Sequence, residues 1–322
     1  MEFTNNTSFP TLLHRAALNN DIIAMAVMCR ITYDISEDGT ATIAKEQEWK
    51  LHEEAWVHEE YGPMDTDNVY NKEGVDIMVF GSAKAPKGKT LTESEVSVSL
   101  NGKMLHRIKV FGNRVWKSFL GILSKSNPEP FTEIPLTIYN AFGGMAHWDG
   151  LEFPYSANPY GKGYYYTKDD AIGSQLPNIE HYDDLISKWN PWVDPAGVGA
   201  LTILPLKAKY AIELDENNKT INKIKGVFFN TAFPDLIVDK VKIKDEIIVK
   251  GVKAEGDFKL KIPNISLNID VSIGTKQYKN NLVIDQVGLI TNHKQAFITY
   301  RDFFRYKLEP MEKRVCYLTK NN

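Results

Sequence analysis

Short apolar runs separated by turn residues fill the C-terminal third of this chain, and they restrict its possible folds more than any other feature. Apolar and polar residues alternate in these runs, and Pro, Asn, Gly or Lys clusters separate them. Such spacing is typical of antiparallel strands in a sandwich or barrel. The runs are residues 258–262 (FKLKI), 265–273 (ISLNIDVSI), 282–290 (LVIDQVGLI), 296–306 (AFITYRDFFRY) and 314–318 (RVCYL).

The first third of the chain carries the same pattern. Residues 22–34 (IIAMAVMCRITYD) predict a buried strand. In residues 75–82 and 95–100, apolar side chains recur at every second position. Asn101-Gly102 follows the second of these runs and predicts a tight hairpin with residues 103–112. We therefore predict a mainly β fold of antiparallel, sandwich-like sheets with few helices.

A loop-rich region interrupts the strand pattern in the middle of the chain. Eight of the 15 prolines lie between Asn127 and Gly199, and loops of this length usually serve function or interaction. The sequence contains no evident linker. We predict one unit over residues 1–322, in which β-rich portions (20–125 and 201–322) pack with a loop-rich aromatic portion (126–200).

Residues 139–166 gather nine of the 36 aromatic residues, together with five glycines and two prolines. Because this composition excludes a regular helix or strand, the rings either fill a loop-rich core or line a binding surface. Tyr139, Phe142 and the alternating members of the Tyr164–Tyr166 run are predicted to be interior. Polar neighbours favour the surface for four other rings, which we predict to bind a partner protein: Trp148, Phe153, Tyr155 and Tyr160.

Charge and N-terminal sequence limit the partners and the location. The 322 residues include 38 Lys and Arg against 41 Asp and Glu, a net charge of −3, so we expect neither nucleic acid nor membrane as a partner. The N-terminus lacks the features of a secretory signal, and the early apolar run at residues 22–29 is too short to cross a bilayer. We predict a cytoplasmic protein whose Cys29 and Cys316 are reduced thiols, with Cys29 in the core.

Residues 83–90 (AKAPKGKT) match a loose phosphate-binding loop pattern. A phosphate loop must lead into the N-terminus of a helix, but the residues that follow alternate like a strand. Pro86 also removes an amide donor from the loop. We therefore predict a lysine-rich turn between two strands.

Residues 52–60 (HEEAWVHEE) place His52 and His58 among glutamates. Helical zinc ligands lie at i and i+4, which this spacing does not provide. We predict a solvated acidic strand. His147, Asp149 and Glu152 form another polar group, but sequence fixes no geometry for them. Because no recognisable nucleophile motif occurs either, we expect no enzymatic activity, metal site or cofactor.

Seven segments occur in the order found in domain-of-unknown-function family 2169, which the chain resembles from about Ala24 to the C-terminus. Asn113 stands where that family commonly has Asp, so an ion pair of an aspartate is not expected there. The segments are 75–89 (VDIMVFGSAKAPKGK), 110–116 (VFGNRVW), 129–144 (EPFTEIPLTIYNAFGG), 158–166 (NPYGKGYYY), 176–180 (LPNIE), 195–199 (PAGVG) and 228–238 (FFNTAFPDLIV).

The resemblance implies a role in bacterial type VI secretion. Genes of that family accompany those for spike proteins, PAAR tips and toxic effectors. The implied function is a cytoplasmic adaptor or chaperone that binds an effector or PAAR tip and helps load it onto the VgrG-type spike. The resemblance supplies no catalytic residues.

A carbohydrate-binding or carbohydrate-active β-sandwich is the alternative. Exposed Trp and Tyr rings beside carboxylates bind sugars, and a glycosidase needs two carboxyl groups across its sugar site. Asp149 and Glu152 neither support nor exclude that arrangement.

Overall fold

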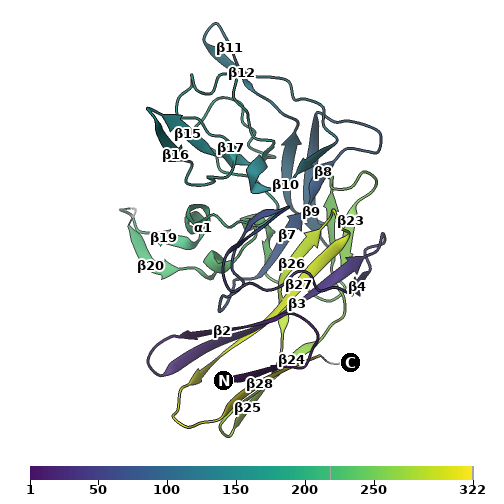
Figure 1. The fold of residues 1–322 in the computed structure, drawn as a ribbon, viewed down its shortest axis with the longest axis vertical. Coiled ribbons are helices and arrows are strands. Elements are labelled where there is room, and N and C mark those ends of the chain that lie inside the picture. The colour runs from purple at the N-terminus through teal and green to yellow at the C-terminus, as the bar shows by residue number, and fades with distance from the viewer. Residues whose placement is uncertain (218, 321–322) are drawn as a thin grey trace.

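The protein is described by a computed structural model that covers residues 1–217 and 219–320. Figure 1 shows an elongated molecule built almost entirely from strands, with a projecting hairpin at one end and both chain termini toward the other. In the described residues, α1 (Leu204–Ala211) is the one α-helix. The prediction of a mainly β fold with several antiparallel sheets is therefore confirmed.

The central sheet has the order β2-β3-β27-β26-β7-β21, and β4 extends β3. Neighbouring strands are antiparallel except β26 and β7, which run parallel. β7 is buried at every position, since both faces of this strand are covered. The strands are β2 (Thr11–Ala17), β3 (Ile22–Ile35), β4 (Ala41–Ile43), β7 (Val75–Phe80), β21 (Ile237–Val238), β26 (Val283–Ile290) and β27 (Gln295–Lys307).

Two further sheets adjoin the central one, with the orders β18-β10-β9-β22-β23 and β1-β28-β24-β25. The predicted hairpin is confirmed: Lys103 pairs with Leu100, and Asn101 and Gly102 both have positive φ, as a type I′ turn requires. The strands are β1 (Glu2–Asn5), β9 (Glu93–Leu100), β10 (Lys103–Phe111), β18 (Ile179–His181), β22 (Glu246–Lys250), β23 (Phe258–Lys261), β24 (Leu267–Ile273), β25 (Lys276–Asn281) and β28 (Arg314–Lys320).

Short strand pairs and 3-10 turns complete the structure, and two of these pairs (β14 with β17, β15 with β16) and the turn η1 lie wholly within residues 126–200. The pairs are β5 (Trp56–His58) with β6 (Gly62–Met64), β8 (Ser82–Lys84) with β13 (Glu133–Pro135), β11 (Trp116–Phe119) with β12 (Ile122–Lys125), β14 (Phe142–Gly143) with β17 (Lys162–Gly163), β15 (Met145–Trp148) with β16 (Leu151–Pro154), and β19 (Ile212–Leu214) with β20 (Thr220–Ile224). The 3-10 turns are η1 (Ile138–Asn140), η2 (Gly226–Phe229) and η3 (Pro234–Leu236).

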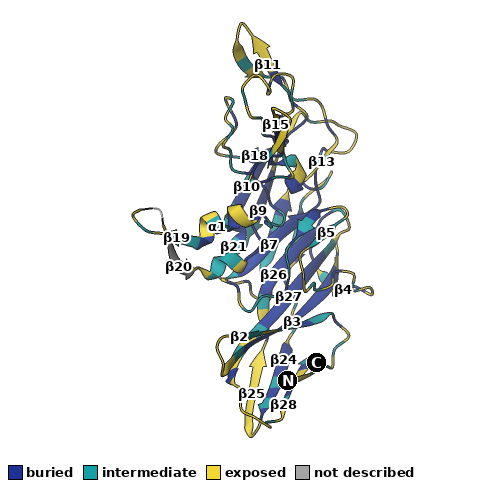
Figure 2. Ribbon diagram, turned by 60° about the vertical axis from the view of Figure 1, so that its left-hand side comes forward, coloured by how far each residue is buried: buried dark blue, intermediate teal, exposed yellow. Residues whose placement is uncertain are grey.

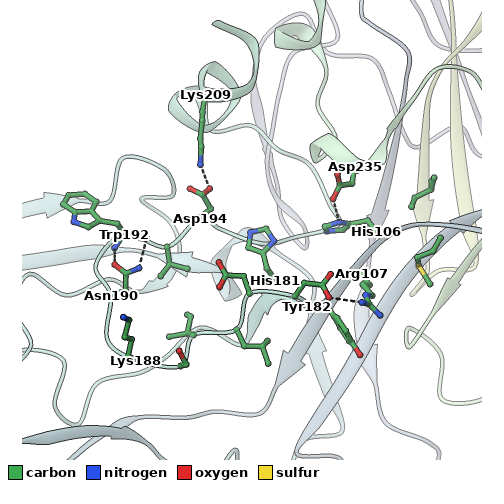
Figure 3. Close-up of a pocket in the computed structure, with 18 residues that line it drawn as sticks. His106, Arg107, His181, Tyr182, Lys188, Asn190, Trp192, Asp194, Lys209 and Asp235 are labelled. Atoms are coloured by element: carbon green, nitrogen blue, oxygen red, sulfur yellow. Dashed lines mark hydrogen bonds and ion pairs between the residues drawn. The ribbon is translucent and has the colours of Figure 1, made fainter. Parts of the chain in front are cut away.

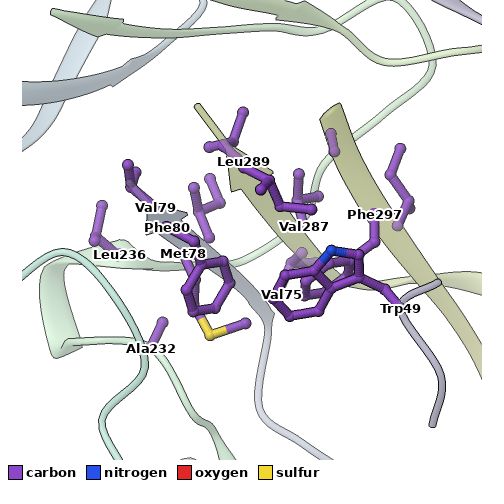
Figure 4. Packing of buried hydrophobic residues seen from close by; sticks show 14 of the residues in the cluster. Trp49, Val75, Met78, Val79, Phe80, Ala232, Leu236, Val287, Leu289 and Phe297 are labelled. Atoms are coloured by element: carbon purple, nitrogen blue, oxygen red, sulfur yellow. The ribbon is translucent and has the colours of Figure 1, made fainter. Parts of the chain in front are cut away.

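The main hydrophobic core draws on strands from both ends of the chain (Figure 2). In Figure 4 the Trp49 ring lies against Phe297, with a centroid separation of 4.8 Å, and Phe80 packs on Trp49 at 5.3 Å. Gly288 of β26 pairs with Phe297 on the neighbouring strand β27, and a Cβ on Gly288 would lie 2.2 Å from the Phe297 ring. The glycine is therefore needed for the ring to lie flat on the sheet.

Buried charges fasten the long loop between β4 and β7 to the central sheet. The Arg30 guanidinium pairs with Asp67 and donates to the carbonyl of Lys50 at 2.8 Å. It also donates to Gln286 Oε1 at 2.8 Å and to Thr299 Oγ1 at 2.9 Å. Because these contacts satisfy the donors of the buried Arg30 guanidinium, they hold the loop in place.

Asp76 joins two of the segments that carry the family resemblance. Its fully buried carboxylate accepts hydrogen bonds from Lys72 Nζ (2.9 Å), Asn230 Nδ2 (2.9 Å), Thr231 N (3.0 Å), Thr231 Oγ1 (3.1 Å) and Ala232 N (3.2 Å). Burial alone would raise the pKa of Asp76, but Lys72 and the other donors outweigh it and lower the pKa.

A second buried pair joins two more of these segments. Arg114 donates to Glu180 Oε1 at 2.5 Å and to the carbonyl of Pro177 at 2.8 Å. Asn113, the residue that departs from the family pattern, instead accepts a hydrogen bond from Asn178 Nδ2 at 3.3 Å. Arg114 thus has its acidic partner without an aspartate at position 113.

The predictions for residues 83–90, which match a phosphate-loop pattern, and for the histidine-containing residues 52–60 had different outcomes. Residues 83–90 form the predicted turn, which leads from β8 into β9 rather than into a helix. The prediction of one solvated strand over residues 52–60 was wrong, because only Trp56–His58 is a strand. His52 stacks on Trp56 at 4.0 Å and His58 on Trp49 at 5.1 Å, so both histidines pack against aromatic rings.

Both cysteines are free and buried, and burial raises the pKa of each thiol to about 12. The prediction of unpaired thiols, with Cys29 in the core, is confirmed. Within residues 1–217 and 219–320, no group of three or more His, Cys, Asp or Glu side chains could hold a metal ion. Over the same residues, no helix has the length and apolar character needed to cross a membrane.

Candidate functional site

The four rings predicted to bind a partner lie in three different environments. Trp148 is 49% exposed, Tyr160 is 52% exposed and Phe153 is half-buried. Tyr155 is only 5% exposed. The predicted surface position is thus confirmed for Trp148 and Tyr160 and wrong for Tyr155.

Trp148 and Phe153 belong to one hairpin, β15–β16. Asp149 and Gly150 form its turn, both with positive φ. Trp148 pairs with Leu151, and Phe153 lies two residues further along β16, so both rings project from the same face of the hairpin. Tyr166 stacks on both of them, with centroid separations of 5.2 and 5.5 Å. We call Trp148, Phe153 and Tyr166 the aromatic platform.

Tyr155 is interior because its hydroxyl has a hydrogen-bond acceptor within the protein. The hydroxyl donates to the carbonyl of Val193 at 3.0 Å, which permits burial of the whole ring. The ring meets Phe142 edge-on at 5.3 Å and lies 4.9 Å from Tyr164. Burial raises the pKa of Tyr155 to about 12. Tyr155 therefore belongs to a second, smaller core beneath the loop region, with Trp116, Phe142, Ala171, Leu176 and Ile186.

Two rings predicted to be interior are instead exposed. Tyr139 is 41% exposed and Tyr166 is 44% exposed, whereas Phe142 is buried as predicted. Tyr139 meets Tyr160 edge-on at 6.2 Å, so the two tyrosines cover each other in part. The surface therefore carries rings from the group predicted to be interior as well as from the group predicted to be exposed.

An apolar groove is lined in part by Pro154, which belongs to the same hairpin as the platform. It encloses about 520 Å³, and its lining consists of residues 55–57, 63–65, 154–156, 159–160 and 202–205. Val57 and Leu204, which are 68% and 62% exposed, come from β5 and the start of α1. Pro154 lines the groove and directly follows Phe153 of the platform, so the β15–β16 hairpin contributes side chains to both features. We refer to this surface as the apolar groove.

Sequence reasoning missed Val57, Leu204 and Tyr166 as surface residues. Val57 lies in the segment that we interpreted as an acidic strand, where the one signal was an aliphatic residue in a stretch rich in glutamate. Leu204 starts the helix and had no distinguishing pattern. Tyr166 follows two other tyrosines, and an alternation rule gave it the wrong side.

A separate polar cleft of about 810 Å³ is lined by residues 104–107, 181–188, 190, 192–194, 209 and 235. Figure 3 shows polar contacts among these residues: ion pairs of Arg107 with Asp183 at 2.9 Å and of Lys209 with Asp194, and a hydrogen bond between His106 and Asp235 at 3.1 Å.

The His106 ring is also 3.1 Å from the carbonyl of Gly197. Burial lowers the pKa of His106 despite Asp235 and the Gly197 carbonyl, which act in the opposite direction. Trp192, 71% exposed, stands at the rim. Two of the described lining residues, Ser187 and Tyr182, carry a hydroxyl group. Neither hydroxyl is hydrogen-bonded to a histidine, so neither is paired with a base as a catalytic nucleophile would be. The cleft suits hydrogen bonding to a polar ligand.

Comparison with known proteins gives one match. The model of a family described as "Uncharacterized protein conserved in bacteria (DUF2169)" matches residues 22–301. The curated proteins and the solved structures gave no match.

Proposed function

Because the chain belongs to the bacterial family DUF2169, whose members are described as uncharacterized, we propose that it is an adaptor that binds another protein. The partner that we propose is a type VI secretion effector or PAAR tip protein, which the adaptor binds in the cytoplasm and helps load onto the spike. The secretion pathway rests on the family resemblance. The binding role rests on the surface described above.

The platform and the groove, which share the β15–β16 hairpin, are the observation that supports this proposal. Protein interfaces are enriched in aromatic rings at their centres and depleted in unpaired charge there. The platform offers three stacked rings, two of them about half exposed, and the lining of the groove is mostly apolar. Such a surface would remove much apolar area from water when a partner covers it.

The surface is also held in one conformation before binding. The platform hairpin closes with a tight turn, and Tyr166 stacks on both strands. Beneath it, Asn158 Nδ2 donates to the carbonyls of Ile138 and Phe142 at 2.9 and 3.0 Å. A surface fixed in advance loses less conformational entropy on association, which favours affinity.

A capture experiment tests the proposal. The variant Trp148→Ala with Tyr166→Ala should capture the effector or PAAR protein encoded next to this gene roughly tenfold to thirtyfold less well, since central aromatic anchors carry about 2 kcal/mol or more. The control is Tyr278→Ala, an exposed tyrosine on β25 in another sheet. Full capture by the double variant with an unchanged melting temperature would overturn the proposal.

The polar cleft favours carbohydrate binding as a second candidate function. Trp192 offers an exposed ring, and Arg107, Asp194 and Lys209 offer hydrogen-bonding groups around the same space. A glycan array tests this candidate: micromolar binding that Trp192→Ala abolishes would support it, and no binding to any glycan would reject it.

A further inference from the structure

Resting on the proposed adaptor role, we infer which chemical element of the partner occupies the apolar groove. The occupant is an uncharged, apolar face of a helical segment in the partner protein. The groove recognises its side chains and makes no strand pairing with its backbone.

The charge of the groove determines the first property of the occupant. Asp65 is the charged residue among the described lining residues, and Lys207 Nζ already lies 2.5 Å from its carboxylate. The Lys207 side chain is 8% exposed and the Asp65 side chain 25%, so this pair is largely shielded from water. A charged side chain from a partner would lose its hydration here without finding a free opposite charge. The groove therefore selects an uncharged segment.

Proline residues determine the second property. Pro63 of β6 and Pro154 of β16 lie in strands that line the groove, and Pro159 and Pro205 line it between them. A proline has no backbone N–H, so it cannot donate to the carbonyls of an added strand. A partner that enters as an extended strand would leave carbonyls unsatisfied.

A helix avoids that cost because its backbone hydrogen bonds are internal. Only its side chains need to enter the groove, whose volume of about 520 Å³ lies within the 300–1,000 Å³ range of pockets that bury small molecules. Val57 and Leu204, from separate elements, supply exposed aliphatic contacts for those side chains. Leu or Ile residues spaced i, i+4 on one helix face fit this arrangement.

The test uses two labelled synthetic helices built on Ala and Gln. One carries Leu at i, i+4 and i+7, and its matched partner carries Lys at the same positions. Fluorescence anisotropy should show saturable binding of the Leu helix to the wild-type protein and none of the Lys helix. Leu204→Lys and Val57→Lys should each weaken that binding tenfold or more, with unchanged circular dichroism.

The control variant is Ile122→Lys, since Ile122 is 69% exposed on the β11–β12 hairpin and does not line the groove. Equal binding of the two helices, or equal binding by Leu204→Lys and wild type, would overturn the inference.

Capture of the natural partner separates this inference from the proposed function. If Leu204→Lys captures the partner fully while the platform variant does not, the groove inference is overturned and the adaptor role stands. If the wild-type protein captures no neighbouring effector or PAAR protein but still binds the Leu helix at the groove, the proposed function is overturned and the groove specificity stands.

Discussion

Replacing Asp76 by Ala should destabilise the protein more than replacing any surface carboxylate. The Asp76 carboxylate has no exposed area and accepts five hydrogen bonds, one of them from the Lys72 ammonium. Removing one partner of a buried ion pair costs about 3–5 kcal/mol, because the remaining charge stays buried without compensation. Lys72 would retain only Asp285, whose carboxylate lies 3.8 Å away.

Asp76→Asn separates charge from shape. The amide keeps one acceptor oxygen but turns an NH₂ group toward donors such as Thr231 N, so about half of the loss is expected, roughly 2 kcal/mol. Urea unfolding followed by tryptophan fluorescence measures both variants as shifts in the transition midpoint. Since a typical domain is stable by only 5–15 kcal/mol, a loss near 4 kcal/mol would be evident.

Glu37→Gln is the matched control, because Glu37 is an exposed carboxylate with two lysine partners. It pairs with Lys253, and its Oε1 lies 2.8 Å from Lys294 Nζ. Its midpoint should stay close to that of the wild type, since exposed pairs are screened by water. Equal midpoints for Asp76→Ala and Glu37→Gln would refute the reasoning that the buried carboxylate stabilises the fold by joining β7 to residues 230–232.

Three further predictions concern acid stability, backbone geometry and the thiols. The pKa of Asp76 is lower in the folded state than in the unfolded chain, so its contribution to stability is present above about pH 4 and is lost as the pH falls through the folded pKa. Asp76→Asn should therefore flatten the acid side of a plot of melting temperature against pH. Gly143→Ala should lower the free energy of unfolding by about 2 kcal/mol or more in urea titrations, because φ is +150° and a Cβ would lie 2.0 Å from the Asn158 carbonyl oxygen. Cys29 and Cys316, whose pKa values are about 12, should react with Ellman's reagent only after unfolding, and rapid reaction of the native protein would contradict their burial.

The strands could be predicted from sequence because their signals are local. Asn101-Gly102 specifies its turn through the positive φ of both residues, and the period-two pattern of residues 265–273 needs no distant partner. The parallel pairing of β26 with β7 could not be predicted, since the sequence of neither strand identifies the strand it pairs with.

The exposure of the rings could be predicted only in part. Tyr155 is interior because Val193, distant in sequence, supplies an acceptor for its hydroxyl. Val57 and Leu204 form one groove because the fold brings together β5 and the start of α1. These properties depend on tertiary contacts, whereas composition reports only that many rings are present.

The order of strands in the central sheet has a consequence for synthesis on the ribosome. β3 and β7 belong to the first part of the chain, but β27 and β26 lie between them and are translated near its end. Until those late strands emerge, the 14-residue β3 has β2 and the short β4 beside it but lacks its long neighbour, and its apolar side chains have no finished core to enter. The nascent protein therefore passes through a long aggregation-prone stage, which general chaperones would need to protect.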